Sequence, residues 1–351
     1  MNSPPLDKLV PEHIKRFAPY IPSKPDNELI KLYGCSHLFR LNNNENPLGP
    51  PEAAREVIDR FPAARASIYP SGDAYHLRHE LAERFGLDPE QLLVGNGANE
   101  VIGFVIKAFC QEGDNIITAD KTFAVYEWVA EFSGFEARLV PLVDFGFDDE
   151  EMLGRIDEKT KIVFICNPNN PTGSYWDEER LRGFLRNIAG RQIVVVDEAY
   201  CEFVEKEDYP DGIRLRIGYL AGDRDVVDII RRTCVVYSVN GLAQEAALAA
   251  LNNQEHINRT REMVREGKEF VAKELDILGL PFVHDQGNFM MIRLPMSDSL
   301  AYRKLMTQGV MVRTMTGFRF PNYIRLTISN MEAMEAFIEA LKKIVPKGEK
   351  P

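Results

Sequence analysis

The chain has 351 residues, enough for more than one hydrophobic core, because single cores stop growing at about 250–300 residues. Hydrophobic residues make up 45% and charged residues 27% of the sequence, which is close to average soluble usage. The formal net charge of −11 argues against nucleic acid or an anionic membrane surface as the main partner, since both attract concentrated positive charge.

The cysteines, five in number, are scattered and never form a Cys-x-x-Cys pair. They indicate neither a disulfide framework nor a metal site, and a reducing cytoplasm fits them best. The first 17 residues lack a signal-peptide core, and no apolar run approaches the ~20 residues that span a bilayer. We therefore expect a cytoplasmic protein without a bound metal.

Helical and strand patterns alternate from about Asp73, which we expect to cap a helix that ends at Gly86. A second helix is predicted over Val101–Phe109. Short apolar runs predict strands at Gln91–Val94, Asn115–Thr118, Ala137–Val140, Lys161–Cys166 and Gln192–Val196. Continuous apolar runs are typical of strands covered on both faces, so we predict an α/β fold with a mostly parallel sheet between helices.

The pattern of predicted helices and strands changes after Asn253. A long charged helix, predicted over His256–Leu278, precedes three strands and a closing helix at Met331–Ile344. The strands are predicted at Phe289–Leu294, Val310–Arg313 and Tyr323–Ile328. We expect an N-terminal arm (1–45) that joins a small α+β domain (254–351), with a large domain (46–253) between them.

The segment Gly95–Glu100 lies between a predicted strand and a predicted helix. Free backbone N–H groups and the helix dipole favour an anion such as phosphate there, although a plain tight turn is the alternative. A dinucleotide site is disfavoured because Glu100 occupies the third glycine position of that fingerprint.

Two further segments follow buried strands and carry polar side chains. Asp197 ends one strand, where a carboxylate needs a cationic or hydrogen-bonding partner. The partner is either the protonated ring nitrogen of pyridoxal phosphate, the N–H groups of a helix start, or magnesium. Asn167–Gly173, with two prolines and a glycine, forms a stiff loop that presents asparagines at the sheet end where α/β proteins bind ligands.

With these motifs, the chain resembles fold-type I pyridoxal-phosphate enzymes of the class I and II aminotransferase group, and within it the histidinol-phosphate aminotransferase family. The resemblance covers nearly the whole chain and includes Asn44–Gly49, Tyr69–Pro70 and Tyr323–Thr327. It implies pyridoxal 5′-phosphate as cofactor, a large domain with a seven-stranded type of sheet, and a homodimer with composite sites.

The resemblance implies two sets of cofactor contacts. Ala98, Asn99 and Arg216 would hold the cofactor phosphate, together with Tyr69 from the partner subunit.

The second set surrounds the cofactor ring. Phe123 would stack on the ring, Asn170 and Tyr200 would hydrogen-bond its phenolic oxygen, and Asp197 would pair with its nitrogen. Of these, Asp197 and Tyr200 would take part in catalysis.

For the substrate, the resemblance implies a pocket lined by Tyr20, Asn44, Arg313 and Arg325. The two arginines would bind the phosphate of histidinol phosphate and, in the other half-reaction, the carboxylate of glutamate, because a guanidinium offers a planar fork to either anion. Surface ion pairs are the alternative for these arginines. The implied reaction gives imidazole acetol phosphate and glutamate from histidinol phosphate and 2-oxoglutarate, a step of histidine biosynthesis.

One departure from the family concerns the lysine that carries the cofactor as a Schiff base. Asp211–Leu215 runs directly into Arg216–Tyr219, so the expected lysine stretch and a strand are absent. Either a disordered cofactor loop is missing from the sequence near Leu215, or the deletion is genuine and the protein is a catalytically inactive relative. We expect the former, because loss of a central strand would be hard to reconcile with a stable core.

Other functions stay open from the sequence. An aromatic or broad-specificity aminotransferase and a threonine-phosphate decarboxylase share most cofactor residues, and a noncatalytic protein that keeps pyridoxal phosphate follows if the deletion is genuine. A nicotinamide dehydrogenase is disfavoured by Glu100.

Overall fold

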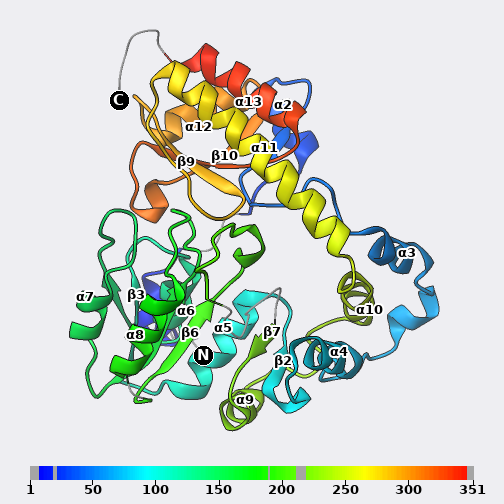
Figure 1. The fold of residues 1–351 in the computed structure, drawn as a ribbon, viewed down its shortest axis with the longest axis vertical. Helices are drawn as coiled ribbons and strands as arrows, with labels where there is room; N and C mark the ends of the chain where they lie inside the picture. Colours follow the sequence, from blue (N-terminus) through cyan, green and yellow to red (C-terminus); the bar gives the residue numbers. More distant parts are fainter. Residues whose placement is uncertain (1–7, 19–21, 189, 211–218, 346–351) are drawn as a thin grey trace, which may run out of the picture.

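A computed structural model describes residues 8–18, 22–188, 190–210 and 219–345. Figure 1 shows two bodies joined by the long helix α11 (Gln254–Leu278), which runs from beside α10 (Gly241–Ala250) up to the smaller body. Each body has its own large cluster of buried apolar side chains. The domain boundaries at 45/46 and 253/254 stay predictions.

The main sheet of the large domain has four parallel strands in the order β4-β3-β5-β6. The strands are β3 (Asn115–Ala119), β4 (Glu136–Val140), β5 (Thr160–Cys166) and β6 (Ile193–Asp197). β3 is buried along its whole length, as the continuous apolar run predicts for a strand covered on both faces. The α/β class with a mostly parallel sheet is thereby confirmed.

A second sheet of this domain has only two strands, β2 (Leu92–Val94) and the antiparallel β7 (Tyr219–Ala221). Figure 1 shows this pair beside the four-stranded sheet. Within the described residues, the strands of the large domain therefore form two separate sheets of four and two strands, and not one sheet of seven. Residues 211–218, which precede β7, lie outside the described residues.

Within the described residues, β6 lies at the edge of the four-stranded sheet. In the neighbouring strand β5, Ile162–Cys166 are at most 2% exposed. In β6, Ile193, Val194 and Val196 are only half-buried, although the run is as apolar as that of β5. Such a sequence belongs in the middle of a sheet, and at an edge it leaves apolar side chains and backbone groups uncovered.

The helices of the large domain follow the predicted alternation. Those before the long helix α11 are α3 (Glu52–Arg60), α4 (Tyr75–Phe85), α5 (Ala98–Phe109), α6 (Val125–Phe132), α7 (Asp149–Gly154), α8 (Glu178–Ile188), α9 (Arg224–Arg231) and α10. The prediction that Asp73 caps α4 is wrong: Ala74 is the N-cap residue, and the Asp73 carboxylate instead accepts hydrogen bonds from Ser71 and from the buried Arg78.

The small domain contains a continuous five-stranded sheet in the order β1-β10-β11-β9-β8. Its strands are β1 (Phe39–Leu41), β8 (Phe282–Val283), β9 (Phe289–Arg293), β10 (Val310–Thr314) and β11 (Tyr323–Thr327). The helices α11, α12 (Asp298–Met306) and α13 (Met331–Ile344) belong to the same body. β1 pairs in parallel with β10, so the N-terminal segment joins this domain as expected. Two short helices, α1 (Glu12–Lys15) and α2 (Asp26–Tyr33), precede β1.

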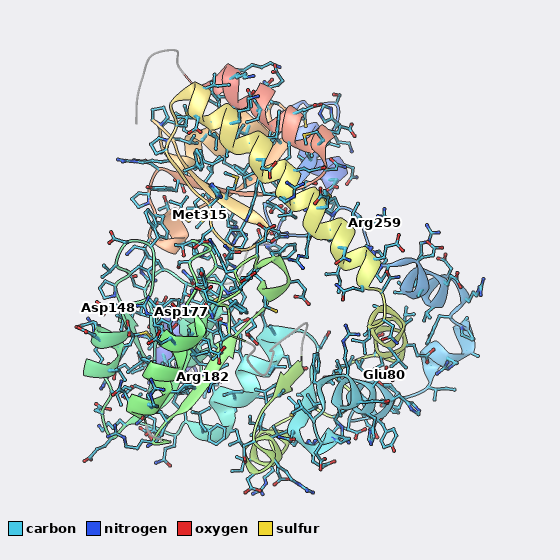
Figure 2. The ribbon with its side chains drawn as sticks, in the orientation of Figure 1. Glu80, Asp148, Asp177, Arg182, Arg259 and Met315 are labelled. Atoms are coloured by element: carbon cyan, nitrogen blue, oxygen red, sulfur yellow. The ribbon has the colours of Figure 1, made fainter. Side chains whose placement is uncertain are left out.

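The two domains touch through apolar and polar contacts. Met315 lies where the small domain meets the large one, in a cluster with Phe320 against which Leu142 and Phe145 of the large domain pack (Figure 2). The Gln286 N–H donates to the carbonyl oxygen of Gly173 at 2.9 Å. Polar side chains at the ends of strands in both domains are therefore held close to one another. None of the helices in the described parts of the chain is long and apolar enough to cross a membrane.

Candidate active site

The first component of the site is a buried carboxylate at the end of β6. Asp197 is 6% exposed and accepts hydrogen bonds from the Tyr126 hydroxyl at 2.5 Å and from the Ala199 N–H at 3.1 Å. Burial raises the pKa of this carboxyl above its usual value. No cation pairs with it among the described residues, so the site offers a partially compensated negative charge. No cluster of three or more histidine, cysteine, aspartate or glutamate side chains that could hold a metal ion occurs in the described part of the chain.

An aromatic side chain supports this carboxylate. Tyr126, in the first turn of α6, is fully buried and stacks on Phe164 of β5 with a centroid distance of 4.7 Å. Phe123, three residues earlier, packs edge-to-face against it at 5.6 Å. The structure therefore links Phe123 to Asp197 through Tyr126. Sequence analysis did not single out Tyr126; its spacing of three from Phe123 was the available signal.

The second component is a hydrogen-bonded group around Tyr200. Its hydroxyl oxygen accepts from the side-chain amides of Asn44, at 2.9 Å, and Asn170, at 3.2 Å. Asn170 lies in the loop after β5, whereas Asn44 follows β1 of the small domain. Three residues expected in the site are thus brought together, and they join the two domains.

The third component is Arg325 in β11, which is 5% exposed. Its guanidinium donates to the Asn170 side-chain oxygen at 2.6 Å and to the Asn42 carbonyl oxygen at 2.9 Å, while its Nε has no partner. Burial lowers the pKa of Arg325 to about 10. A buried guanidinium held only by neutral acceptors is costly, because buried charges are normally paired.

Arg313 lies directly opposite Arg325 on the neighbouring strand β10. The Arg313 guanidinium lies 5.7 Å from the centroid of the Phe318 ring and has no carboxylate partner among the described residues. Like charges opposite each other in an antiparallel pair destabilise a sheet. The arrangement therefore favours an anion that both arginines contact, and the alternative of surface ion pairs is not supported.

The glycine turn before α5 has the form expected of an anion site. Gly97, with φ of 86°, is the N-cap residue, and the helix begins at Ala98, three residues earlier than predicted. Ala98 and Asn99 thus lie in the first turn, where backbone N–H groups are free of helical partners. The Glu100 carboxylate accepts from the Asn96 N–H at 2.6 Å. No hydrogen bond connects Ala98 or Asn99 to Asp197 or Tyr200 in the described residues.

The remaining expected site residues are placed differently or not at all. Tyr69 is 80% exposed and stacks on Tyr237 at 4.7 Å, and its expected contact with the cofactor of the partner subunit stays a prediction. Tyr20 and Arg216 lie outside the described residues.

Lysine is not among the residues that the described part of the chain brings to this site. Within the described ranges, no lysine side chain forms a hydrogen bond or ion pair with Asp197, Asn170 or Tyr200. The lysine-bearing stretch of the family is absent from these 351 residues, and the expectation that a cofactor loop is missing near Leu215 stays a prediction.

Solved structures of aminotransferases share this fold. The structure of histidinol-phosphate aminotransferase from Sinorhizobium meliloti in complex with pyridoxal-5′-phosphate superposes with a TM-score of 0.83 over 95% of this chain and 96% of that chain, at 21% identity. Histidinol-phosphate aminotransferase from Clostridium acetobutylicum gives a TM-score of 0.79 over 88% and 99%, at 23% identity. At these identities the likeness shows the fold alone.

Relatives found by sequence have a higher identity to this chain than these solved structures have. The chain is 34% identical to histidinol-phosphate aminotransferase of Moorella thermoacetica, over 95% of this chain and 92% of the relative. It is 33% identical to that of Caldicellulosiruptor saccharolyticus, over 95% and 99%. The aligned lengths, 357 and 356 positions, exceed the 351 residues of the chain, so the chain lacks residues that these relatives have.

A family model, aminotransferase class I and II, matches residues 36–215 and again 212–341. The two matched ranges overlap at residues 212–215, beside the place where the lysine stretch is absent from the sequence. Together these two segments cover most of the sequence. The chain belongs to the class I and II aminotransferases.

Proposed function

We propose that the protein transfers the amino group of L-histidinol phosphate to 2-oxoglutarate, using pyridoxal 5′-phosphate. The observation that carries the proposal is the pair Arg313 and Arg325, which face each other on adjacent strands without a carboxylate partner. A phosphate monoester and a dicarboxylate both satisfy such a pair, because each offers several oxygens to planar guanidinium forks. The sequence relatives named for this activity support the choice of substrate.

The residues present fit the cofactor. Asp197 is a buried carboxylate without a cation, which suits a protonated ring nitrogen. Tyr200 and Asn170 present polar groups beside it, and Phe123 supplies an aromatic face. The first turn of α5, at Ala98 and Asn99, offers free N–H groups to a phosphate. When bound, pyridoxal phosphate supplies an electron sink for the carbon that exchanges its proton.

The positions of these residues give the two domains different roles in ligand binding. The large domain holds the ring through Asp197, and the small domain holds the substrate anion through Arg313 and Arg325. Asn170 contacts Arg325 from the large-domain side, so the anion pocket and the ring pocket share one wall. Fixing both ends of a reactant in this way converts binding energy into orientation of the reacting atoms.

One catalytic group is not supplied by the described site. Amino transfer requires a base that moves a proton between two carbons, and a lysine usually serves as that base in the family. General acid–base groups contribute about 10²–10⁴-fold to rates, so we expect this chain to bind its ligands but to turn over slowly.

An assay of the full chain tests the proposal. With histidinol phosphate, 2-oxoglutarate and pyridoxal phosphate, we expect slow glutamate formation without release of carbon dioxide, and acceleration by a small primary amine added as an external base. Amine-dependent turnover would identify the missing base as the limiting factor. Faster reaction with aromatic amino acids would favour a broad-specificity aminotransferase, and carbon dioxide release would favour a decarboxylase.

A second candidate function is noncatalytic binding of pyridoxal phosphate. The absent lysine and the divided sheet favour it, because both remove parts of the catalytic apparatus and leave Asp197, Asn170 and Tyr200 in place. Tight cofactor binding with no glutamate formation, even with the added amine, would establish this function.

We also propose a cytoplasmic homodimer. An exposed apolar patch supports it, with Ile68 66%, Tyr69 80%, Val235 58% and Val236 64% exposed. Exposed apolar patches of this kind mark protein interfaces. Tyr69 within the patch is the residue expected to reach the partner's cofactor. Light scattering of the purified protein tests the dimer, and a monomeric mass would contradict it.

A further inference from the structure

The directions of the hydrogen bonds around Tyr200 can be assigned by starting from Arg325, which contacts Asn170, which in turn contacts Tyr200. Arg325 can only donate, so the Asn170 oxygen must face it, and the Asn170 NH₂ group must face the Tyr200 hydroxyl. Asn170 therefore donates to Tyr200. The amide orientation is fixed by the guanidinium, which is the reliable way to assign an asparagine.

The orientation of Asn44 is fixed from the small domain. Its backbone N–H donates to the Thr327 hydroxyl oxygen at 2.9 Å, and that hydroxyl donates to the Asn44 side-chain oxygen at 3.2 Å. Asn288 donates to the Asn44 carbonyl oxygen at 3.0 Å. Asn44 adopts a left-handed conformation with φ of 60°, which asparagine tolerates better than most residues. Its NH₂ group is left to donate to Tyr200 at 2.9 Å.

The Tyr200 oxygen thus receives two donors, one from each domain, and no acceptor for its own hydrogen exists among the described residues. Resting on the proposed function, we infer that Asn44 is a positioning residue that makes Tyr200 a hydrogen-bond donor toward the cofactor pocket, so that the pocket selects a ligand with an acceptor oxygen at that place. Asn44 then acts through Tyr200 and not as a substrate contact, the role that the resemblance implied.

The electrostatics agree with this role. Burial raises the pKa of Tyr200 above its ordinary value, whereas Arg325 and the hydrogen bond from Asn44 lower it. Donors to the phenol oxygen stabilise negative charge there and strengthen the donated hydrogen bond. The coupling also crosses the domain junction, because Asn44 is held by Thr327 and Asn288 of the small domain.

The replacement Asn44→Asp tests the inference with little change of shape. A carboxylate only accepts, so Tyr200 should turn its hydrogen to residue 44 and away from the pocket. Asn44→Gly tolerates the same backbone conformation and removes one donor. The matched control is Asn46→Asp, since the Asn46 side chain contacts Thr260 and His256 instead.

The first readout is the infrared C–O stretching band of Tyr200 in the ligand-free full chain, isolated by subtracting the spectrum of Tyr200→Phe. The band shifts in opposite directions for a donating and an accepting phenol. We expect the accepting position in the unaltered chain and in Asn46→Asp, the donating position in Asn44→Asp, and an intermediate shift in Asn44→Gly. An unchanged band in both Asn44 variants would overturn the inference.

The second readout is the ratio of affinities for pyridoxal phosphate and 3-deoxypyridoxal phosphate, which lacks the acceptor oxygen. We expect the preference for pyridoxal phosphate to fall at least about 10-fold in Asn44→Asp and to stay unchanged in Asn46→Asp. A band that moves while the ratio stays constant would contradict the proposed use of Tyr200 in cofactor binding, and would leave the hydrogen-bond assignment standing.

Discussion

The small domain has a complete sheet, whereas the sheet of the large domain is divided. In the small domain, β1 from the N-terminal segment pairs with β10, and five strands bury a continuous core. In the large domain, β6 and β7 are consecutive strands that end in different sheets. The difference shows that the large domain has its strands in two sheets within the described residues, whereas the strands that carry Arg313 and Arg325 stay paired in one sheet.

Supplying a lysine-bearing segment should have the largest effect. Inserting the corresponding residues of the Moorella thermoacetica relative after Leu215 should join the two sheets and supply the base. We expect turnover to rise by about 10²–10⁴-fold. Steady-state assays measure the rate, and the same insertion with its lysine replaced by alanine is the control. Equal rates for the two insertions would contradict a catalytic role of the lysine.

Replacement of the two arginines of the small domain should reduce substrate affinity to different extents. Arg325→Gln removes a buried guanidinium that touches Asn170, and we expect a loss of about 2–3 kcal/mol, or 30–150-fold, in affinity for histidinol phosphate. Arg313→Gln, at a half-buried position, should cost less. Calorimetric titration measures both. Equal binding by the unaltered chain and both variants would remove the basis of the anion pocket.

The two sheets should also respond differently to the same truncation. Val312 in β10 is 1% exposed, so Val312→Ala should reduce the free energy of unfolding by about 2 kcal/mol. Val194 on the open edge of β6 is half-buried, and Val194→Ala should cost under about 1 kcal/mol. Denaturant unfolding followed by circular dichroism measures both changes. A larger loss for Val194→Ala would mean that the β6 edge is covered.

The smallest expected effect concerns Asp197 in the ligand-free protein. Burial raises the pKa of its carboxyl in the folded state, so stability is greatest when it is protonated and declines as pH rises through that pKa. Asp197→Asn should remove this dependence and stabilise the ligand-free chain at pH 7 by about 1 kcal/mol. Thermal unfolding at several pH values checks it. Identical pH profiles for both proteins would contradict the proposed cost of the buried charge.

Much of the fold was predictable because apolar periodicity is a local signal. The helix at Met331–Ile344 and the runs that became β3, β5 and β6 were placed within about two residues. The division of the sheet was not predicted, because strand pairing is a long-range property. An apolar run has the same sequence pattern in a central strand and in an edge strand of a sheet. The Asp73 cap failed because the nearby buried Arg78 competes for the same carboxylate.

The site was predictable where a motif fixes residue types and less so where contacts cross domains. The loop after β5 and the end of β6 identified Asn170 and Asp197. The contact between Asn44 and Tyr200 joins residues 156 positions apart, and no spacing of residues in the sequence predicts this contact. Tyr126 was missed because a buried tyrosine in a helix resembles an ordinary core residue.

Cofactor binding to the unmodified full chain tests the central claim most directly. We predict that pyridoxal phosphate binds, that dialysis removes it, and that Asp197→Asn weakens binding at least about 10-fold. Borohydride treatment should leave the protein at its mass of 39.9 kDa, because no lysine of the site attaches the cofactor. A covalent cofactor adduct within the site, or equal binding by Asp197→Asn, would contradict the account.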